Sequence, residues 1–210
     1  MRQTFLNLPT GKQNRIICAA IDEFSRFPYP KTSVNRIVEG AGIPKGSFYQ
    51  YFENKDDLYI YCVFTLARKI MQSQAQNQKG LLTSTFRRTA EMGIPGILEL
   101  RERETVDAVG EKGFQVMQGI MEAPVHLRSA AILKIAREIY QPAFKAELEA
   151  DPAIRPGADI DYFAYLFSIS ELIAVQYWDG KDMDIRQMNT NTYEYLKAIY
   201  DHLQKNEARR

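Results

Sequence analysis

Apolar residues recur every three or four positions along two short stretches near the start of the chain, with a glycine between them. The first stretch, residues 34–41, predicts a helix with one apolar face, made by Val34, Ile37, Val38 and Ala41. Gly42 follows at the position where helices often end in a left-handed residue. The second stretch, residues 45–52, predicts a short helix anchored by Phe48 and Phe52, which lie four positions apart on one face. The pattern therefore predicts two helices joined by a glycine turn.

A third helix is predicted on the N-terminal side of this pair. Residues 12–27 carry an apolar stripe at helical spacing, and Pro28 and Pro30 then end the helix. The stripe consists of Ile17, Ala20, Ile21, Phe24 and Phe27. Thr32 and Ser33 precede the first short helix, where we expect a hydroxyl group to accept a hydrogen bond from an unpaired amide.

A helix-turn-helix of this kind presents its last helix to the DNA major groove, which is wide enough for one α-helix. We expect four residues of that helix to approach base edges: Lys45, Gly46, Tyr49 and Gln50. The remaining expected DNA contacts are Thr32, Ser33, Ser47, Tyr51 and Lys55, with Lys55 at a helix start that favours a phosphate. The alternative is an ordinary amphipathic helix whose polar side is only solvated.

The charge distribution changes the weight of these two interpretations. Residues 1–55 contain eight Lys and Arg against four Asp and Glu, whereas the other 155 residues contain nineteen against twenty-two. The basic excess therefore coincides with the predicted helix-turn-helix, where phosphate charge has to be neutralised. It favours a local DNA-binding site over binding by the whole surface.

The run SVNRIVEGAGIPKGSFYQYFENKDDL, residues 33–58, resembles the DNA-binding domain of the TetR family of bacterial transcriptional regulators. Pro44 stands where many members carry a serine. The resemblance implies an all-α fold with a helix-turn-helix domain over residues 1–55 and a ligand-binding and dimerisation domain over residues 56–210. It also implies a cytoplasmic, ligand-responsive repressor that binds a palindromic operator in double-stranded DNA as a homodimer.

The pattern of the remaining chain is helical throughout, without strand alternation. Asn54 is placed to cap a long connecting helix over residues 54–78. Gly93-Ile94-Pro95-Gly96 predicts a kink or loop in the next helical stretch, and Pro142 predicts a kink in a later one. The other predicted helices cover residues 81–109, 112–122, 125–149, 158–178 and 187–205.

The helix over residues 158–178 is apolar on almost every side, so more than one surface has to cover it. We expect it to pair with residues 187–205 and with the same two helices of a second copy. The predicted interface is Leu166, Ile169, Ile173, Tyr177, Leu196, Ile199, Tyr200 and Leu203. The alternative is a helix buried entirely within a monomer.

Aromatic residues and methionines at helical steps also predict an apolar cavity for an unidentified small-molecule effector. The candidate lining is Phe114, Met117, Met121, Tyr140, Phe144, Phe163 and Phe167. Residues of these types are more often part of an ordinary core, and this alternative stays open. Residues 101–104, Arg-Glu-Arg-Glu, are expected to form a solvated, mutually paired face.

Catalytic chemistry finds little support in the chain, and we expect neither an enzyme nor a cofactor. Glu122 and His126 have the spacing of a metal pair, but Pro124 between them disrupts the helix that would align them. Cys18 and Cys62 have no metal or redox spacing and are expected to be buried, reduced thiols. The chain has no apolar run of roughly 20 residues that could span a membrane. A non-catalytic alternative also stays open, in which the helix-turn-helix binds a protein partner in place of DNA.

Overall fold

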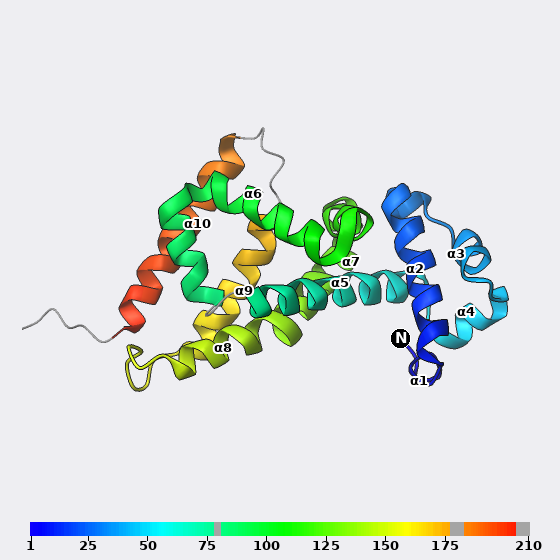
Figure 1. Cartoon of the computed structure of the whole chain (residues 1–210), viewed down its shortest axis with the longest axis horizontal. Coiled ribbons are helices and arrows are strands. Elements are labelled where there is room, and N and C mark those ends of the chain that lie inside the picture. Colours follow the sequence, from blue (N-terminus) through cyan, green and yellow to red (C-terminus); the bar gives the residue numbers. More distant parts are fainter. Residues whose placement is uncertain (78–80, 177–182, 205–210) are drawn as a thin grey trace, which may run out of the picture. The chain divides into compact units, whose positions relative to one another are not determined.

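Helices form almost all of the computed structural model, which describes residues 1–77, 81–176 and 183–204 (Figure 1). The chain divides into two compact units, each described by itself below. The N-terminal unit contains Met1–Lys69 and Val106–Ala131, and the C-terminal unit contains Ile70–Thr105 and the residues from Ile132 onward. The expected all-α fold is confirmed over the described residues.

Helices at the start of the N-terminal unit follow the predicted pattern closely. They are α1 (Gln3–Leu6), α2 (Thr10–Arg26), η1 (Tyr29–Lys31), α3 (Val34–Ala41) and α4 (Lys45–Tyr51), followed by the connecting helix α5 (Lys55–Asn77). The predicted helices over residues 12–27, 34–41, 45–52 and 54–78 are each confirmed to within two residues. The short helix α1 was not predicted, and it packs against α4.

Two predicted capping arrangements are confirmed. Gly42 ends α3 in the left-handed region at φ 64°, and the amide of Ile43 donates to the carbonyl of Val38 at 3.0 Å. Asn54 caps α5, since its Oδ1 atom accepts a hydrogen bond from the amide of Asp57 at 2.8 Å. These two caps fix where α3 stops and where α5 starts.

The predicted hydroxyl cap of α3 is wrong. Ser33 occupies the N-cap position, but its side chain makes no capping hydrogen bond. Thr32 is buried, and its Oγ1 atom donates to the carbonyl of Tyr29 at 2.7 Å. The acceptor for α3 comes from α2, where Glu23 Oε1 lies 2.7 Å from the amide nitrogen of Ser33.

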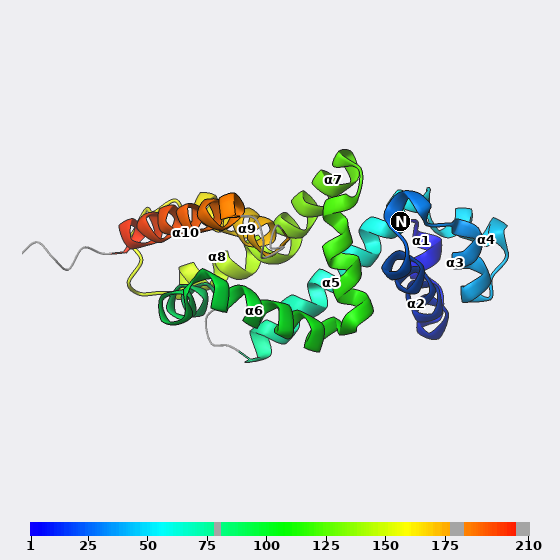
Figure 2. The same ribbon diagram turned by 90° about the horizontal axis from the view of Figure 1, so that it is seen from above.

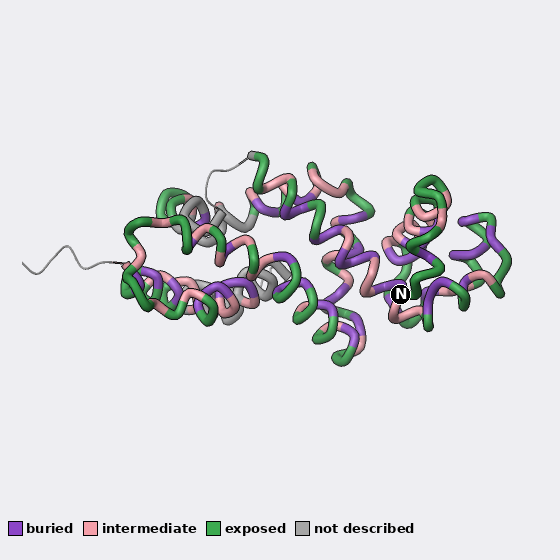
Figure 3. Tube along the Cα trace, turned by 90° about the horizontal axis from the view of Figure 1, so that it is seen from below, coloured by how far each residue is buried: buried purple, intermediate pink, exposed green. Residues whose placement is uncertain are grey.

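The buried side of α2 differs from the predicted apolar stripe at two positions, one near each end of the helix. Ile16 is fully buried, whereas Phe27 is 37% exposed. Since α2 ends at Arg26, Phe27 lies in extended backbone and leaves the helical face. Its ring lies under the guanidinium of Arg36, with 4.5 Å between the guanidinium carbon and the ring centroid. Figure 3 shows buried and exposed positions alternating along these helices, as amphipathic packing requires.

The second half of the chain contains α6 (Leu81–Gln118), η2 (Gly119–Glu122) and α7 (Val125–Ile135). Figures 1 and 2 show α6 bending within its first half, the part that contains the predicted kink at residues 93–96. Farther along, Gly110 has a φ of 73°, so the helix loses regular geometry where the sequence predicted a gap between two helices.

The C-terminal unit continues with a π-helical segment over Ala136–Tyr140 and then α8 (Gln141–Ala150), α9 (Ile160–Gln176) and α10 (Met183–Leu203). Pro142 lies in the first turn of α8. Because proline lacks an amide hydrogen and its ring displaces the carbonyl four residues earlier, the preceding turn widens. The predicted disruption at Pro142 is confirmed. Helix α9 packs against both α8 and α10 (Figure 1).

Part of the predicted dimer interface lies in the core of the same chain, which is a correction. The cluster formed by α8, α9 and α10 contains Phe144, Leu148, Phe163, Ala164, Phe167, Leu196, Tyr200 and Leu203. Leu196, Tyr200 and Leu203 therefore cover α8 and α9, and Leu166 packs against this cluster. Ile169 is half-buried and Ile199 is 38% exposed. The side chain of Ile173, and Tyr177 as a whole, lie outside the described residues.

The residues of the predicted effector-binding set are divided between the two units. Phe144, Phe163 and Phe167 are buried in the cluster, with 4.7 Å between the ring centroids of Phe144 and Phe167, and the half-buried Tyr140 packs against them. These three phenylalanines are thus part of a packed core, as the core alternative expects. The half-buried Phe114 and Met117 belong to the N-terminal unit, as does Met121, whose side chain is not described.

The expected solvated face over residues 101–104 is wrong for Arg101. Its side chain is buried, and Nη2 donates to Thr85 Oγ1 at 3.0 Å. Glu104 pairs with Arg88 at 2.9 Å, while Glu102 and Arg103 are exposed. None of the described helices combines the length and the apolarity needed to cross a bilayer.

Candidate nucleic-acid interface

Helix α4 has one buried side and one exposed side. Phe48 and Phe52 are fully buried, with 5.5 Å between their ring centroids. The other side of the helix exposes Lys45, Gly46, Tyr49 and Gln50. Tyr49 is 47% exposed although its ring contacts that of Phe48 at 5.1 Å. The four residues predicted to approach base edges thus lie together on one open surface, which we call the α4 face.

Two other members of the predicted DNA-contacting set are buried, which corrects the prediction for them. Tyr51 packs its ring against Phe5 and beneath the ammonium group of Lys12, which lies 5.6 Å from the ring centroid. The hydroxyl of Thr32 donates its hydrogen bond to the carbonyl of Tyr29. Ser33 and Ser47 are half-buried.

The ammonium group of Lys55 takes part in the protein's own structure. Its Nζ atom donates to the carbonyls of Tyr29 at 3.0 Å and Thr32 at 3.2 Å, and it lies 4.3 Å from the centroid of the Tyr29 ring. Burial lowers the pKa of Lys55, against the opposing effect of Asp56. An ammonium group has three N–H donors, so these two carbonyls leave one for a phosphate. Lys55 therefore ties α5 to the segment before α3.

A small polar network lies beside Lys55. The hydroxyl of Tyr29 donates to a carboxylate oxygen of Asp56, and His126 Nε2 lies 3.3 Å from Asp56 Oδ2. Burial and the Asp56 carboxylate raise the pKa of Tyr29, so its hydroxyl remains a donor. The network connects the start of α7 to the start of α5 and to η1 within the N-terminal unit.

A buried carboxylate organises the junction between α2 and α3. Glu23 accepts hydrogen bonds from the amide of Ser33 and from the guanidinium of Arg36, with 2.9 Å between Arg36 Nε and Glu23 Oε2. Arg36 Nη2 also donates to the carbonyl of Lys31 at 2.8 Å. Sequence reasoning missed this role. The only available signal was a glutamate on the apolar side of α2, beside Phe24.

The last part of α6 contacts α2 and α5, the helices that flank the helix-turn-helix. Lys112 forms an ion pair with Asp22 of α2, and this contact is the main reason that the pKa of Asp22 is lowered. The hydroxyl of Tyr59 on α5 donates to the carbonyl of Val116 at 3.4 Å. A Cβ atom at Gly113 would lie only 3.1 Å from Leu66 Cδ2, so α6 and α5 pack closely there. Helix α6 is thus attached to both α2 and α5.

Metal and thiol chemistry gain no support in the described part of the chain. Its residues include no cluster of three His, Cys, Asp or Glu side chains that could hold a metal ion. Cys62 is fully buried as expected, and burial raises the pKa of its thiol. Cys18 is exposed, so the predicted burial is wrong for that thiol.

Comparison with known proteins finds a family that matches one stretch of the chain. Residues 16–62 match the family described as bacterial regulatory proteins, tetR family. The chain is 39% identical over 51 residues to the HTH-type transcriptional regulator RutR of Escherichia coli strain K12, which covers 24% of each chain. It is 26% identical over 91 residues to the uncharacterized HTH-type transcriptional regulator YhgD of Bacillus subtilis strain 168, or 43% of this chain and 47% of that one. The chain thus spans between a quarter and a half of the length of these curated relatives.

Solved structures with the same fold cover almost the whole chain. A tetR-family transcriptional regulator from Streptomyces coelicolor has a TM-score of 0.52 at 18% identity, over 90% of this chain and 82% of that one. Native NalD, the secondary repressor of the MexAB-OprM multidrug efflux pump in Pseudomonas aeruginosa, has a TM-score of 0.52 at 15% identity, over 93% and 98%. At these identities the likeness concerns the fold alone.

Proposed function

Since residues 16–62 match the family of bacterial regulatory proteins described as tetR, we propose that the protein is a DNA-binding transcriptional regulator of this family that is released from its operator by a small molecule. The observation that carries this proposal is the α4 face. Lys45, Gly46, Tyr49 and Gln50 are exposed together on a helix whose opposite side is held by Phe48 and Phe52. A rigid helix with an open polar side is what reading of the major groove requires.

The roles of individual residues follow from exposure. Tyr49 and Gln50 supply a ring, a hydroxyl and an amide for base edges, and Lys45 supplies a cation in the first turn of α4. Ser33, Ser47 and the remaining donor of Lys55 are proposed phosphate contacts. Thr32 and Tyr51 are buried, so we assign them a role in packing the domain and no direct contact with DNA.

Gly46 provides a test of how closely the duplex approaches α4. A Cβ atom at this position would meet nothing within 4 Å in the protein, so internal packing does not require glycine. We therefore expect Gly46→Ala to raise the free energy of unfolding by about 0.5–1 kcal/mol, because alanine has a higher helix propensity than glycine. Operator affinity should nevertheless fall at least tenfold, because the methyl group occupies space needed by the duplex. Thermal melting and fluorescence anisotropy measure the two effects.

Gly40→Ala is the matched control for this variant. Gly40 is also a helical glycine, and its added methyl would make only an ordinary 3.5 Å contact with Ala19. Operator affinity should remain that of the wild type. Equal DNA affinities for Gly46→Ala and the wild type would show that the duplex does not approach this part of α4.

A two-fold pair of such domains is proposed because one short helix reads few base pairs, whereas two read a palindrome. With Leu196, Tyr200 and Leu203 used in the chain's own core, the exposed side of α10 is the better candidate for pairing. Tyr195 and Ile199 lie four positions apart there and are 72% and 38% exposed.

We expect Tyr195→Glu combined with Ile199→Glu to weaken the dimer at least 100-fold, because two charges would be buried against their own copies. Sedimentation over a concentration series measures the change. Leu133→Glu is the control, since Leu133 is an equally exposed apolar residue on α7 and should leave the dimer intact. A wild-type chain that stays monomeric to high micromolar concentration would contradict the pairing itself.

Effector control is proposed to act through α6. This helix contacts α2 through Lys112 and α5 through Val116, so a ligand that displaces α6 changes how the helix-turn-helix is held. A 100-fold loss of operator affinity requires a coupling free energy of about 2.7 kcal/mol. Because a dimer on promoter DNA blocks polymerase sterically, release by the effector gives derepression. An operator affinity unchanged by every ligand that binds the purified protein would contradict this mechanism.

Selection of bound fragments from random duplex DNA tests the function as a whole. Enrichment of a palindrome is expected, with half-sites about one helical turn apart, roughly 34 Å, or a multiple of it. Absence of any enriched sequence would favour the other candidate, a helical module whose helix-turn-helix binds a protein. Lys55→Glu, an obvious charge reversal, is unsuitable for this purpose, because it would break two hydrogen bonds inside the domain.

A further inference from the structure

The N-terminal segment, residues 1–8, lies against the C-terminal end of α4. We propose that it is a working part of the DNA interface, in which it fixes α4 and presents the guanidinium of Arg2 to a phosphate beside the α4 face. This inference rests on the proposed DNA-binding function. It adds an element that lies outside the helix-turn-helix and outside the matched residues 16–62.

Backbone contacts attach the segment to α4. The last carbonyls of a helix have no partner within the helix and need one from elsewhere. Here the amide of Arg2 donates to the carbonyl of Tyr51 at 2.9 Å, and the hydroxyl of Thr4 donates to the carbonyl of Gln50. The segment therefore bonds the backbone of Gln50 itself, one of the two residues proposed to read bases.

Side-chain packing makes the attachment rigid. Phe5 is 0% exposed, and its ring centroid lies 4.8 Å from that of Phe52 and 5.5 Å from that of Tyr61. The terminal ammonium group pairs with Asp57 in the first turn of α5. At the other end, Gln13 Nε2 donates to the carbonyl of Leu8 at 2.8 Å. The segment is thus held at both ends and in the middle.

The position of Arg2 relative to a bound duplex follows from dimensions. The major groove is about 12 Å wide, and an α-helix with its side chains is about 10–12 Å across, so a phosphate strand passes close to each side of the helix. The backbone of Arg2 is bonded to the last residue of α4, and its side chain is exposed. An extended arginine reaches a phosphate from there. Its charge also complements the negative end of the helix dipole.

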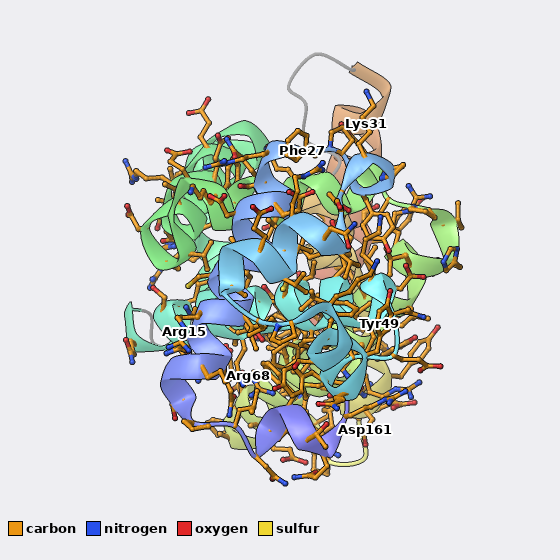
Figure 4. The ribbon with its side chains drawn as sticks, turned by 90° about the vertical axis from the view of Figure 1, so that its right-hand side faces the viewer. Arg15, Phe27, Lys31, Tyr49, Arg68 and Asp161 are labelled. Carbon is orange, nitrogen blue, oxygen red and sulfur yellow. The ribbon has the colours of Figure 1, made fainter. Side chains whose placement is uncertain are left out.

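Arg2→Ala tests the phosphate contact. The variant keeps the backbone amide that bonds to Tyr51, so the fold should be unaffected. Loss of one phosphate contact should reduce the magnitude of the slope of log affinity against log salt by about 0.9, equally for the selected operator and for a scrambled duplex of the same composition. Arg15→Ala is the control, because Figure 4 shows Arg15 and Tyr49 on opposite sides of the domain. Its slope should match that of the wild type.

Phe5→Ala tests the positioning role. Detaching the segment lets α4 move, so the ratio of operator to scrambled-duplex affinity should fall at least tenfold while the affinity for the scrambled duplex changes little. Phe5→Leu, which refills most of the space, should restore the ratio. A circular dichroism melt run alongside identifies a variant that has simply unfolded, and Arg2→Ala then still decides the proposal.

The possible failures are distinguishable. A wild-type protein with no preference for any duplex would overturn the proposed function. A wild-type protein that prefers its operator, together with an unchanged salt slope in Arg2→Ala and an unchanged affinity ratio in Phe5→Ala, would overturn this inference alone.

Discussion

Replacing Tyr49 and Gln50 together by alanine is expected to reduce the preference for the operator over a scrambled duplex by a factor of about 30 or more. Both side chains are exposed on the α4 face, so the core formed by Phe48 and Phe52 should not change. A well-placed base contact contributes about 1–3 kcal/mol of discrimination. Two of them therefore account for roughly 2–6 kcal/mol, in which each 1.4 kcal/mol is a factor of ten.

The measurement is a competition titration of both duplexes at one salt concentration, combined with a thermal melt. Affinity for the scrambled duplex should change little, because phosphate contacts carry no sequence information. Tyr162→Ala serves as the control, since Tyr162 is also an exposed tyrosine but belongs to α9. A double variant that still prefers the operator as strongly as the wild type would show that these side chains do not read the bases.

The helix-turn-helix could be predicted from sequence because its signals are local. Spacing of apolar residues gave α3 and α4, and the left-handed Gly42 gave the turn between them. Exposure of the α4 face followed from the same periodicity. Local signals failed where the partner came from a different helix. Glu23 of α2 accepts the hydrogen bond at the start of α3, and no pattern in the residues just before α3 predicts this contact.

Helix α1 was missed for a related reason. Four residues are too short to show a periodicity. Its conformation depends on the burial of Phe5 among rings from α4 and α5, which are distant in sequence. The buried Tyr51 belongs to the same explanation, because Phe5 covers a surface that the helix pattern alone left open.

In the C-terminal unit, the sequence identified the apolar helices but not the element that covers them. Because the sequence of α9 is apolar on nearly every side, it predicted that a second copy of the chain covers part of this helix. The widened turn before Pro142 is followed by α8, whose Phe144 and Leu148 fill the space against α9 and α10. Periodicity indicates which side of a helix is apolar, whereas topology decides which neighbour covers it.

Glu23→Ala is the second change with a large expected effect, here on stability. It removes the acceptor of the Ser33 amide and the acceptors of the Arg36 guanidinium. Loss of a helix cap costs about 1 kcal/mol, and loss of a hydrogen bond to a charged group costs about 1.5–3 kcal/mol. Since Arg36 remains partly solvated after the change, we expect a total loss of about 2–3 kcal/mol in the free energy of unfolding. Chemical denaturation followed by circular dichroism measures it.

Two further variants separate the contributions at this position. Glu23→Gln keeps an oxygen acceptor for the Ser33 amide but removes the charge, so it should lose less stability than Glu23→Ala. Glu39→Ala removes an exposed glutamate from α3 and should stay within about 0.5 kcal/mol of the wild type. Because Glu23 holds the start of α3, and α3 packs on α4, operator affinity should fall along with stability in the Glu23 series alone. A Glu23→Ala protein as stable as Glu39→Ala would mean that α3 is held by its apolar face and does not need the buried carboxylate.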